Sequence, residues 1–102
     1  MEIYGSFAEI KDCVGFELIK RLSIINSQMN NSNFKAFFKF SNGEKDADIV
    51  TLNERFTQDF VENVMSDCLP ERIYVCGPPQ FNRDIPEFAL NCGFSKDRII
   101  IV

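Results

Sequence analysis

The chain contains no histidine, and its few cysteines include no pair at C-x-x-C spacing. Without histidine, neither a Ser-His-Asp nor a Cys-His relay can form, which excludes the common hydrolase mechanisms. A zinc site would have to be built from widely spaced cysteines alone, so a zinc finger is excluded as well. Because nothing in the sequence indicates secretion, we expect free thiols at Cys13, Cys68, Cys76 and Cys92.

Positive charge and long apolar runs are also scarce. The chain has 11 Lys and Arg against 15 Asp and Glu, a formal net charge of -4. Nucleic acid and anionic membrane surfaces both require clustered cations, so we expect neither as a partner. No stretch approaches the roughly 20 apolar residues of a membrane span, and no signal peptide is recognisable. We therefore expect no direct membrane insertion and an intracellular, soluble location, in the cytoplasm or an organellar matrix.

The length and the order of the segments indicate the fold class. A chain of 102 residues with 45% hydrophobic side chains can bury one core, so residues 1–102 are predicted to form a single domain. Four strand-like segments alternate with three helix-like segments, and this order is typical of parallel crossovers. The predicted fold class is α/β, a parallel open sheet with flanking helices.

The first helix is predicted over residues 15–29 from the spacing of its apolar side chains. Intervals of four, three and four residues place these side chains in one stripe, which we expect to face the sheet. The stripe consists of Leu18, Leu22, Ile25 and Met29.

Two further helices are predicted from capping and end signals. One opens at Thr51, with Glu54 completing a capping box. The other follows residue 78 and ends at Gly93, which suits the left-handed end position. Pro86 cannot donate a backbone hydrogen bond, so this last helix is expected to kink there or to restart with Asp84 as its cap.

The segment 34–40 carries four phenylalanines with two lysines between them. Such a pattern is found in platforms that bind single-stranded nucleic acid. It is also typical of a sheet strand, and the overall acidity together with the Asn42-Gly43 turn signal favours the strand.

The most informative segment is the run from Arg72 to Phe81, RIYVCGPPQF, which reads as a short buried strand that ends in a tight turn and opens a helix. Ligands of open α/β sheets bind at such strand ends. Gly77 lets the backbone approach a ligand, and Pro78 and Pro79 end the strand. A thiol at Cys76, a bare backbone and two rigid rings suit stacking against a flat ring better than acid-base chemistry.

This turn, with the later Gly93 and the apolar strand at 98–102, resembles the end of the coenzyme domain in the ferredoxin-NADP reductase-like superfamily of flavoprotein reductases. The close match covers about a third of the chain, residues 73–102. Weaker similarity extends to the amino terminus. There, residues 3–6 look like the family's second strand and its ribose loop, and residues 34–41 look like its third strand.

The resemblance implies that the chain binds NAD(P)H and serves hydride transfer to FAD, which a missing FAD-binding domain or a partner would hold. Cys76 is the implied residue at the reacting centre, where it would position the nicotinamide ring and not attack it. A buried small hydrophobe is the alternative role for this thiol. The implied coenzyme-binding residues are Gly5, Ser6, Cys76, Gly77, Pro78, Pro79 and Phe81.

Several parts of the family pattern are absent from these residues. The 102 residues contain no glycine-rich phosphate loop and no flavin-binding barrel, and the family's first strand would be expected to precede Met1. In the family's sheet order of 3-2-1-4-5 the first strand is central, so the remaining strands are expected to leave a gap. Unpaired buried peptide groups cost on the order of 1 to 3 kcal/mol each, so the chain must close this gap, borrow a strand or be unstable.

Three interpretations therefore remain open. The first is a partial, Rossmann-like coenzyme domain that is inactive alone, for example the soluble part of a membrane-bound reductase. The second is a non-enzymatic accessory or interaction subunit, within an oligomer or larger assembly, whose partner protein completes the sheet. The third is an autonomous four-stranded sheet that binds another nucleotide or a small anion at the Gly77 turn. The choice between NAD and NADP also stays open, because Phe7 follows Ser6 where a basic residue would favour the phosphorylated coenzyme.

Overall fold

The computed structural model describes residues 1–28, 34–47, 49–67 and 70–102. These residues form a sheet of five strands with three α-helices and two short 3-10 turns. The strands are β1 (Glu2–Phe7), β2 (Lys35–Phe40), β3 (Val50–Leu52), β4 (Ile73–Cys76) and β5 (Ile99–Ile101). The helices are α1 (Phe16–Gln28), α2 (Gln58–Asp67) and α3 (Pro79–Asn91), and the 3-10 turns are η1 (Ile10–Asp12) and η2 (Lys96–Arg98).

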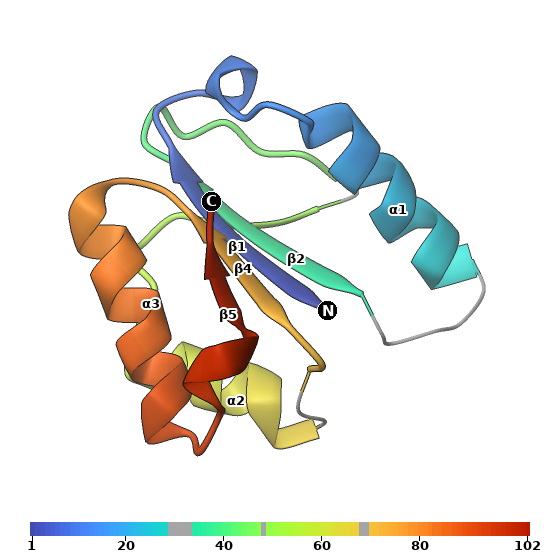
Figure 1. Ribbon diagram of the computed structural model, residues 1–102. Helices are drawn as coiled ribbons and strands as arrows, with labels where there is room; N and C mark the ends of the chain where they lie inside the picture. The colour runs from blue at the N-terminus through green and yellow to red at the C-terminus, as the bar shows by residue number, and fades with distance from the viewer. Residues whose placement is uncertain (29–33, 48, 68–69) are drawn as a thin grey trace.

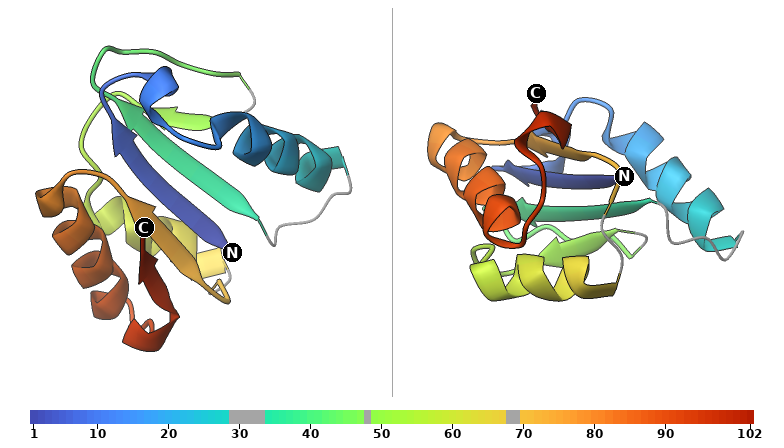
Figure 2. Two further views of the ribbon diagram at one scale, coloured as in Figure 1. Left: turned by 45° about the horizontal axis from the view of Figure 1, so that its top comes forward. Right: turned by 60° about the horizontal axis from the view of Figure 1, so that its bottom comes forward.

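The sheet is entirely parallel and has the strand order β3-β2-β1-β4-β5. Helix α1 lies on one face of the sheet, and α2 and α3 lie on the other (Figures 1 and 2). Both faces of a parallel sheet are covered in this way when crossovers run in opposite directions from a central strand. The α/β prediction is confirmed, and the fold is Rossmann-like.

Strand β1 occupies the centre of the sheet and closes the expected gap. It pairs with β2 from Glu2 to Phe7 and with β4 from Glu2 to Gly5. The expectation that this segment is separated from the Cys-Gly-Pro-Pro strand is therefore wrong. The physical reason is that pairing on both sides satisfies backbone groups that a gap would leave without partners.

The alternation of side chains in β1 and β2 builds one core on each face of the sheet. Tyr4 and Phe37 lie on the side of α2 and α3, with ring centroids 5.3 Å apart. Phe38 and Phe40 lie on the side of α1 and stack with centroids 5.9 Å apart. These rings are buried, so the strand interpretation of segment 34–40 is confirmed, and the rings are not available as a nucleic-acid platform.

The orientation predicted for the first helix is wrong. Leu18, Leu22 and Ile25 are exposed, whereas Phe16 and Ile19 contact the core on the α1 side. The helix carries apolar residues on two sides, and the large ring of Phe16 occupies the sheet side, packing edge-on against two phenylalanines of β2. Met29, the last residue of the predicted stripe, lies outside the described residues.

The second helix differs from its predicted start, and the third begins after residue 78 as predicted but does not restart. Thr51 lies in β3, because the segment pairs with β2, and α2 begins only at Gln58. The capping role falls to Thr57, whose Oγ1 accepts a hydrogen bond from the backbone N–H of Phe60 at 3.2 Å. Helix α3 runs from Pro79 to Asn91 without a restart at Asp84, although it contains Pro86.

The buried face of α3 explains its continuity. Ile85 and Ala89 are both buried in the core on the α2 and α3 side, and this packing holds the helix on the sheet although Pro86 removes one backbone donor. Gly93 follows the helix with φ of 87°, so its predicted left-handed conformation is confirmed.

A buried polar pair lies near the amino end of β1. Both side chains are buried, and the Tyr4 hydroxyl donates a hydrogen bond to Oε1 of Glu2 at 2.8 Å. Burial raises the pKa of Glu2 above its ordinary value, although the Tyr4 hydrogen bond and the charge of Lys35 oppose the rise. The carboxyl group of Glu2 is therefore a site at which stability depends on pH.

Candidate functional site

The candidate site lies where the carboxyl ends of β1, β2 and β4 meet. Gly5 is level with Cys76 on one side, and Ser6 is level with Lys39 on the other. After β1 the chain crosses to the face of α1, and after β4 it crosses to the face of α3 (Figure 1). Neighbouring strands whose connections leave in opposite directions form the crevice in which open α/β sheets bind ligands.

The first cavity at this edge has a volume of about 420 Å³. It is open to the surface and lies between the ends of β1 and β4. Its lining residues are Ser6, Phe7, Ala8, Ser41, Cys76, Gly77 and Pro78. Four of the residues that the sequence nominated are thus brought together around one opening.

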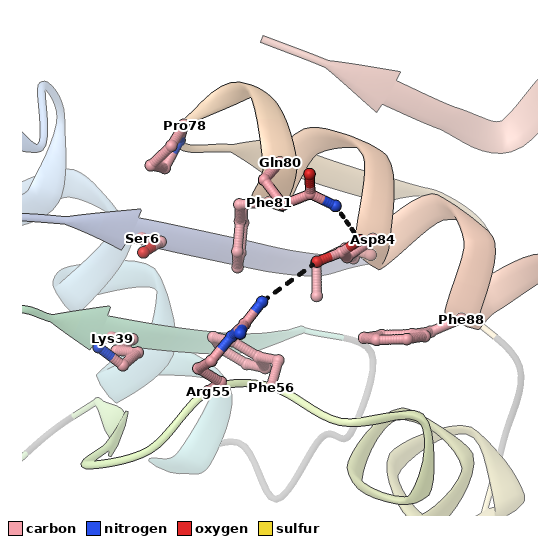
Figure 3. Close-up of a pocket in the computed structure, with 10 residues that line it drawn as sticks. Ser6, Lys39, Arg55, Phe56, Pro78, Gln80, Phe81, Asp84 and Phe88 are labelled. Carbon is pink, nitrogen blue, oxygen red and sulfur yellow. Dashed lines mark hydrogen bonds and ion pairs between the residues drawn. The ribbon is translucent and has the colours of Figure 1, made fainter.

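A second, smaller cavity of about 160 Å³ adjoins the first, because Ser6 and Pro78 line both. Figure 3 shows its aromatic and charged side chains, which come from β2, from the segment before α2 and from the start of α3. The lining residues are Ser6, Lys39, Arg55, Phe56, Pro78, Gln80, Phe81, Asp84, Ile85 and Phe88. Of the predicted binding residues, this cavity adds Phe81.

Gly5 and Pro79 do not line either cavity. A Cβ on Gly5 would lie 2.5 Å from Cε1 of Phe38, so the ring of Phe38 covers the backbone there. Pro79 occupies the first turn of α3, where a missing N–H costs nothing. These two residues serve the packing and the local geometry of the site, and neither contacts the space that a ligand would fill.

Gly77 has both a packing role and a place on the cavity wall. A Cβ on this residue would lie 2.6 Å from Cδ1 of Phe81. The Phe81 ring in turn packs edge-on against Phe56 at a centroid distance of 5.5 Å. Glycine at this position therefore allows an aromatic ring to form part of the floor of the smaller cavity.

Cationic groups give the smaller cavity its electrostatic character. Nη2 of Arg55 lies 3.8 Å from Oδ2 of Asp84, whose Oδ1 accepts a hydrogen bond from Nε2 of Gln80 at 2.7 Å (Figure 3). Within the described ranges, no carboxylate lies within 4.0 Å of the Lys39 ammonium. The first-turn amides of α3 also point out of the helix at this end, as they do in every α-helix. The arrangement suits a ligand that carries negative charge.

The thiols near the site do not form a catalytic relay. Cys76 is partly exposed on the larger cavity, whereas Cys13 is buried beneath it on the α1 side. Burial, with a smaller effect of the Cys76 thiol, raises the pKa of Cys13 to about 11, so this thiol is protonated at neutral pH. Cys13, Cys76 and Cys92 are free, as predicted, and Cys68 lies outside the described residues.

The arrangement can bind a ligand, but it does not offer acid-base chemistry. Asp84 is the carboxylate of the smaller cavity, and it is held by Arg55 and Gln80.

In the part of the chain that the structure describes, no three Cys, Asp or Glu side chains lie close enough together to form a metal site. None of the helices in the same ranges is long and apolar enough to cross a membrane.

Sequence reasoning missed the charged half of the site. Lys39 looked like one polar position of an alternating strand, and Arg55 looked like part of a helix. The one available signal was the place of Lys39 at the carboxyl end of its strand, because ends of parallel strands meet at the same edge. Arg55 and Asp84 meet only through the tertiary fold.

Comparison of the chain with family models, curated proteins and solved structures found no match. The arrangement of the site and the resemblance of its turn to the reductase family are therefore the basis of the proposal below.

Proposed function

We propose that the carboxyl edge of the sheet binds a nicotinamide coenzyme. In this proposal the chain is the coenzyme-binding part of a flavoprotein reductase, and FAD is held by sequence outside these residues. The observation that carries the proposal is the meeting of Ser6 with Cys76, Gly77 and Pro78 around one cavity at the crossover point. The two segments lie far apart in the sequence and meet only through the pairing of β1 with β4.

The larger cavity fits the nicotinamide ring. Gly77 and Pro78 offer a flat, rigid wall, and Cys76 offers a small polarizable side chain beside it. A flat ring held against such a wall is oriented and shielded from water on one side, which hydride transfer requires. The bound coenzyme supplies the hydride, and Cys76 fixes the position of the ring without forming a bond to it.

The phosphate groups require a different explanation, because the chain has no glycine-rich loop. The ring of Phe38 also covers the backbone at Gly5, where a phosphate would otherwise approach closely. Lys39, Arg55 and the first amides of α3 are the groups that supply positive potential at the adjoining cavity. We assign the charged part of the coenzyme to this smaller cavity, next to Ser6.

An interaction subunit is the second candidate function. The exposed apolar side chains of α1 favour it, since contiguous apolar surface often marks a contact with another protein. A partner that donates the central strand is not needed, because β1 already pairs with strands on both sides. In this form the second candidate predicts saturable protein binding and no response to coenzyme.

The test is a titration of the isotope-labelled chain with NADH and NADPH, followed by amide correlation spectra. The proposal predicts saturable shifts at Ser6 and at residues 76–81. Lys39→Met should weaken binding of either coenzyme about tenfold, the loss of one charge-assisted contact. Lys45→Met, which removes the same charge from an exposed loop residue outside both cavities, is the matched control. A well-dispersed spectrum that neither coenzyme changes at millimolar concentration would overturn the proposal.

A further inference from the structure

The outward face of α1 carries an apolar stripe that no described residue covers. Leu18, Leu22 and Ile25 are 63%, 40% and 50% exposed, and Val14, just before the helix, is 96% exposed. Within the helix, spacings of four and three residues place Leu18, Leu22 and Ile25 along one side. The opposite side holds Phe16, which packs into the core.

Charged residues flank this stripe on one side. At 100° per residue, Glu17 and Arg21 project next to one another, on the same edge of the stripe. Lys20 projects on the other side of the helix, where its ammonium lies 3.0 Å from Oδ2 of Asp46. The outward surface of α1 is thus an apolar stripe with one acidic and one basic residue along a single edge.

We propose that this surface pairs with the same surface of a second copy of the chain, with the two α1 helices antiparallel. A two-fold axis between the helices, level with residues 19–20, brings Leu18 of each copy beside Leu22 of the other. The same axis brings Ile25 of each copy level with the start of the other helix, next to the turn that carries Val14. Such an isologous contact buries both central leucines against apolar partners.

The charges select the antiparallel arrangement. In antiparallel helices related by a two-fold axis, the same edges of the two stripes meet, so Glu17 of each copy lies level with Arg21 of the other. Two equivalent ion pairs form. In a parallel pair the charged edge would meet the opposite edge of the stripe, which carries Asn26 and no charge. The sequence of α1 is therefore complementary to itself in one orientation.

The size of this contact sets the expected affinity. Helix α1 has 13 residues, a length of about 20 Å at 1.5 Å per residue. One helix pair of this length buries less than the roughly 1,000 Å² that a stable interface needs. We expect a reversible dimer with a dissociation constant on the order of 100 μM.

Sedimentation equilibrium of the whole chain, from micromolar to millimolar concentration, tests this pairing. The apparent mass of the wild-type protein should rise from that of a monomer to that of a dimer as its concentration increases. Leu18→Ser combined with Leu22→Ser should raise the dissociation constant at least about tenfold, the loss expected when central apolar contacts are removed. Leu90→Ser, at an exposed leucine of α3 that is 43% accessible, is the matched control and should leave the constant unchanged.

A charge exchange tests the orientation. Glu17→Arg should weaken the dimer by about threefold to tenfold at low salt, since it places like charges together. Adding Arg21→Glu to that variant exchanges both charges and should restore wild-type affinity in a homodimer. A chain that stays monomeric at millimolar concentration, or a dimer that the paired serine substitutions do not weaken, would overturn the proposal. So would a double exchange variant that remains as weak as the single one.

Discussion

Replacing Gly5 with alanine tests whether packing or ligand approach requires glycine in the central strand. The added Cβ would lie 2.5 and 2.6 Å from two ring atoms of Phe38 and 2.9 Å from the ring of Phe7. Phe38 is buried and packs edge-on against Phe16, so its ring cannot move away freely. Overpacking of this kind costs about 1 to 3 kcal/mol. For a domain of this size that lowers the melting temperature by roughly 4 to 20 °C.

The assay is urea unfolding of four proteins that form a double-mutant cycle. Gly5→Ala and Phe38→Leu are made alone and together, because leucine removes the ring atoms that the new methyl group would meet. We expect a coupling energy of about 1 kcal/mol or more, with Gly5→Ala costing less in the leucine background. A neutral Gly5→Ala substitution, or a cost that is the same in both backgrounds, would refute the packing explanation of this glycine.

Three further predictions concern pH, capping and the cavity wall. The pKa of Glu2 is raised in the folded state. The contribution of this carboxyl group to stability is therefore greatest below its ordinary pKa of 4.5 and declines as pH rises through the folded pKa. Glu2→Gln should therefore become more stable than wild type towards neutral pH, and a pH-independent difference in urea midpoints would contradict this. Thr57→Ala removes the cap of α2 and should cost about 1 kcal/mol in urea unfolding, whereas an unchanged midpoint would exclude a capping role. Gly77→Ala forces the Phe81 ring to move and should weaken NADH binding by calorimetry more than Ser27→Ala, a change at an exposed position of α1 outside the cavities.

The fold class followed from the sequence because alternation of segment types depends only on local pattern. The phenylalanine-rich segment 34–40 with the turn signal after it predicted β2, and Gly93 predicted the end of α3. The position of β1 did not follow from the family pattern, which sets its strand beside the centre of the sheet. Backbone pairing decided the outcome, since a strand with free edges on both sides of a gap is costly.

The two clear errors in the helices have different causes. The stripe at Leu18, Leu22 and Ile25 has the period of a buried face, but Phe16 makes a second apolar side on the same helix. The spacing of apolar residues shows that a helix has an apolar face, but it does not show which part of the protein covers that face. Thr51 was assigned to a helix cap because its short strand, only three residues long, has too little length to show alternation.

The site was predictable where its residues lie next to one another in the sequence. Cys76, Gly77 and Pro78 form one turn, and Ser6 ends a strand, so the meeting of strand ends brings them to one edge. Arg55 and Asp84 come from segments that are not at strand ends, and their approach depends on how α3 packs over the sheet. No local pattern contains that information.

The measurement that tests coenzyme binding at this edge most directly is an intermolecular nuclear Overhauser experiment on the labelled chain with saturating NADH. The structure-based proposal predicts contacts between protons of the nicotinamide ring and side-chain protons of Cys76 and Pro78, which line the larger cavity. Ring contacts confined to other parts of the surface, or none at a concentration that saturates the amide shifts, would contradict the assignment of this cavity to the nicotinamide.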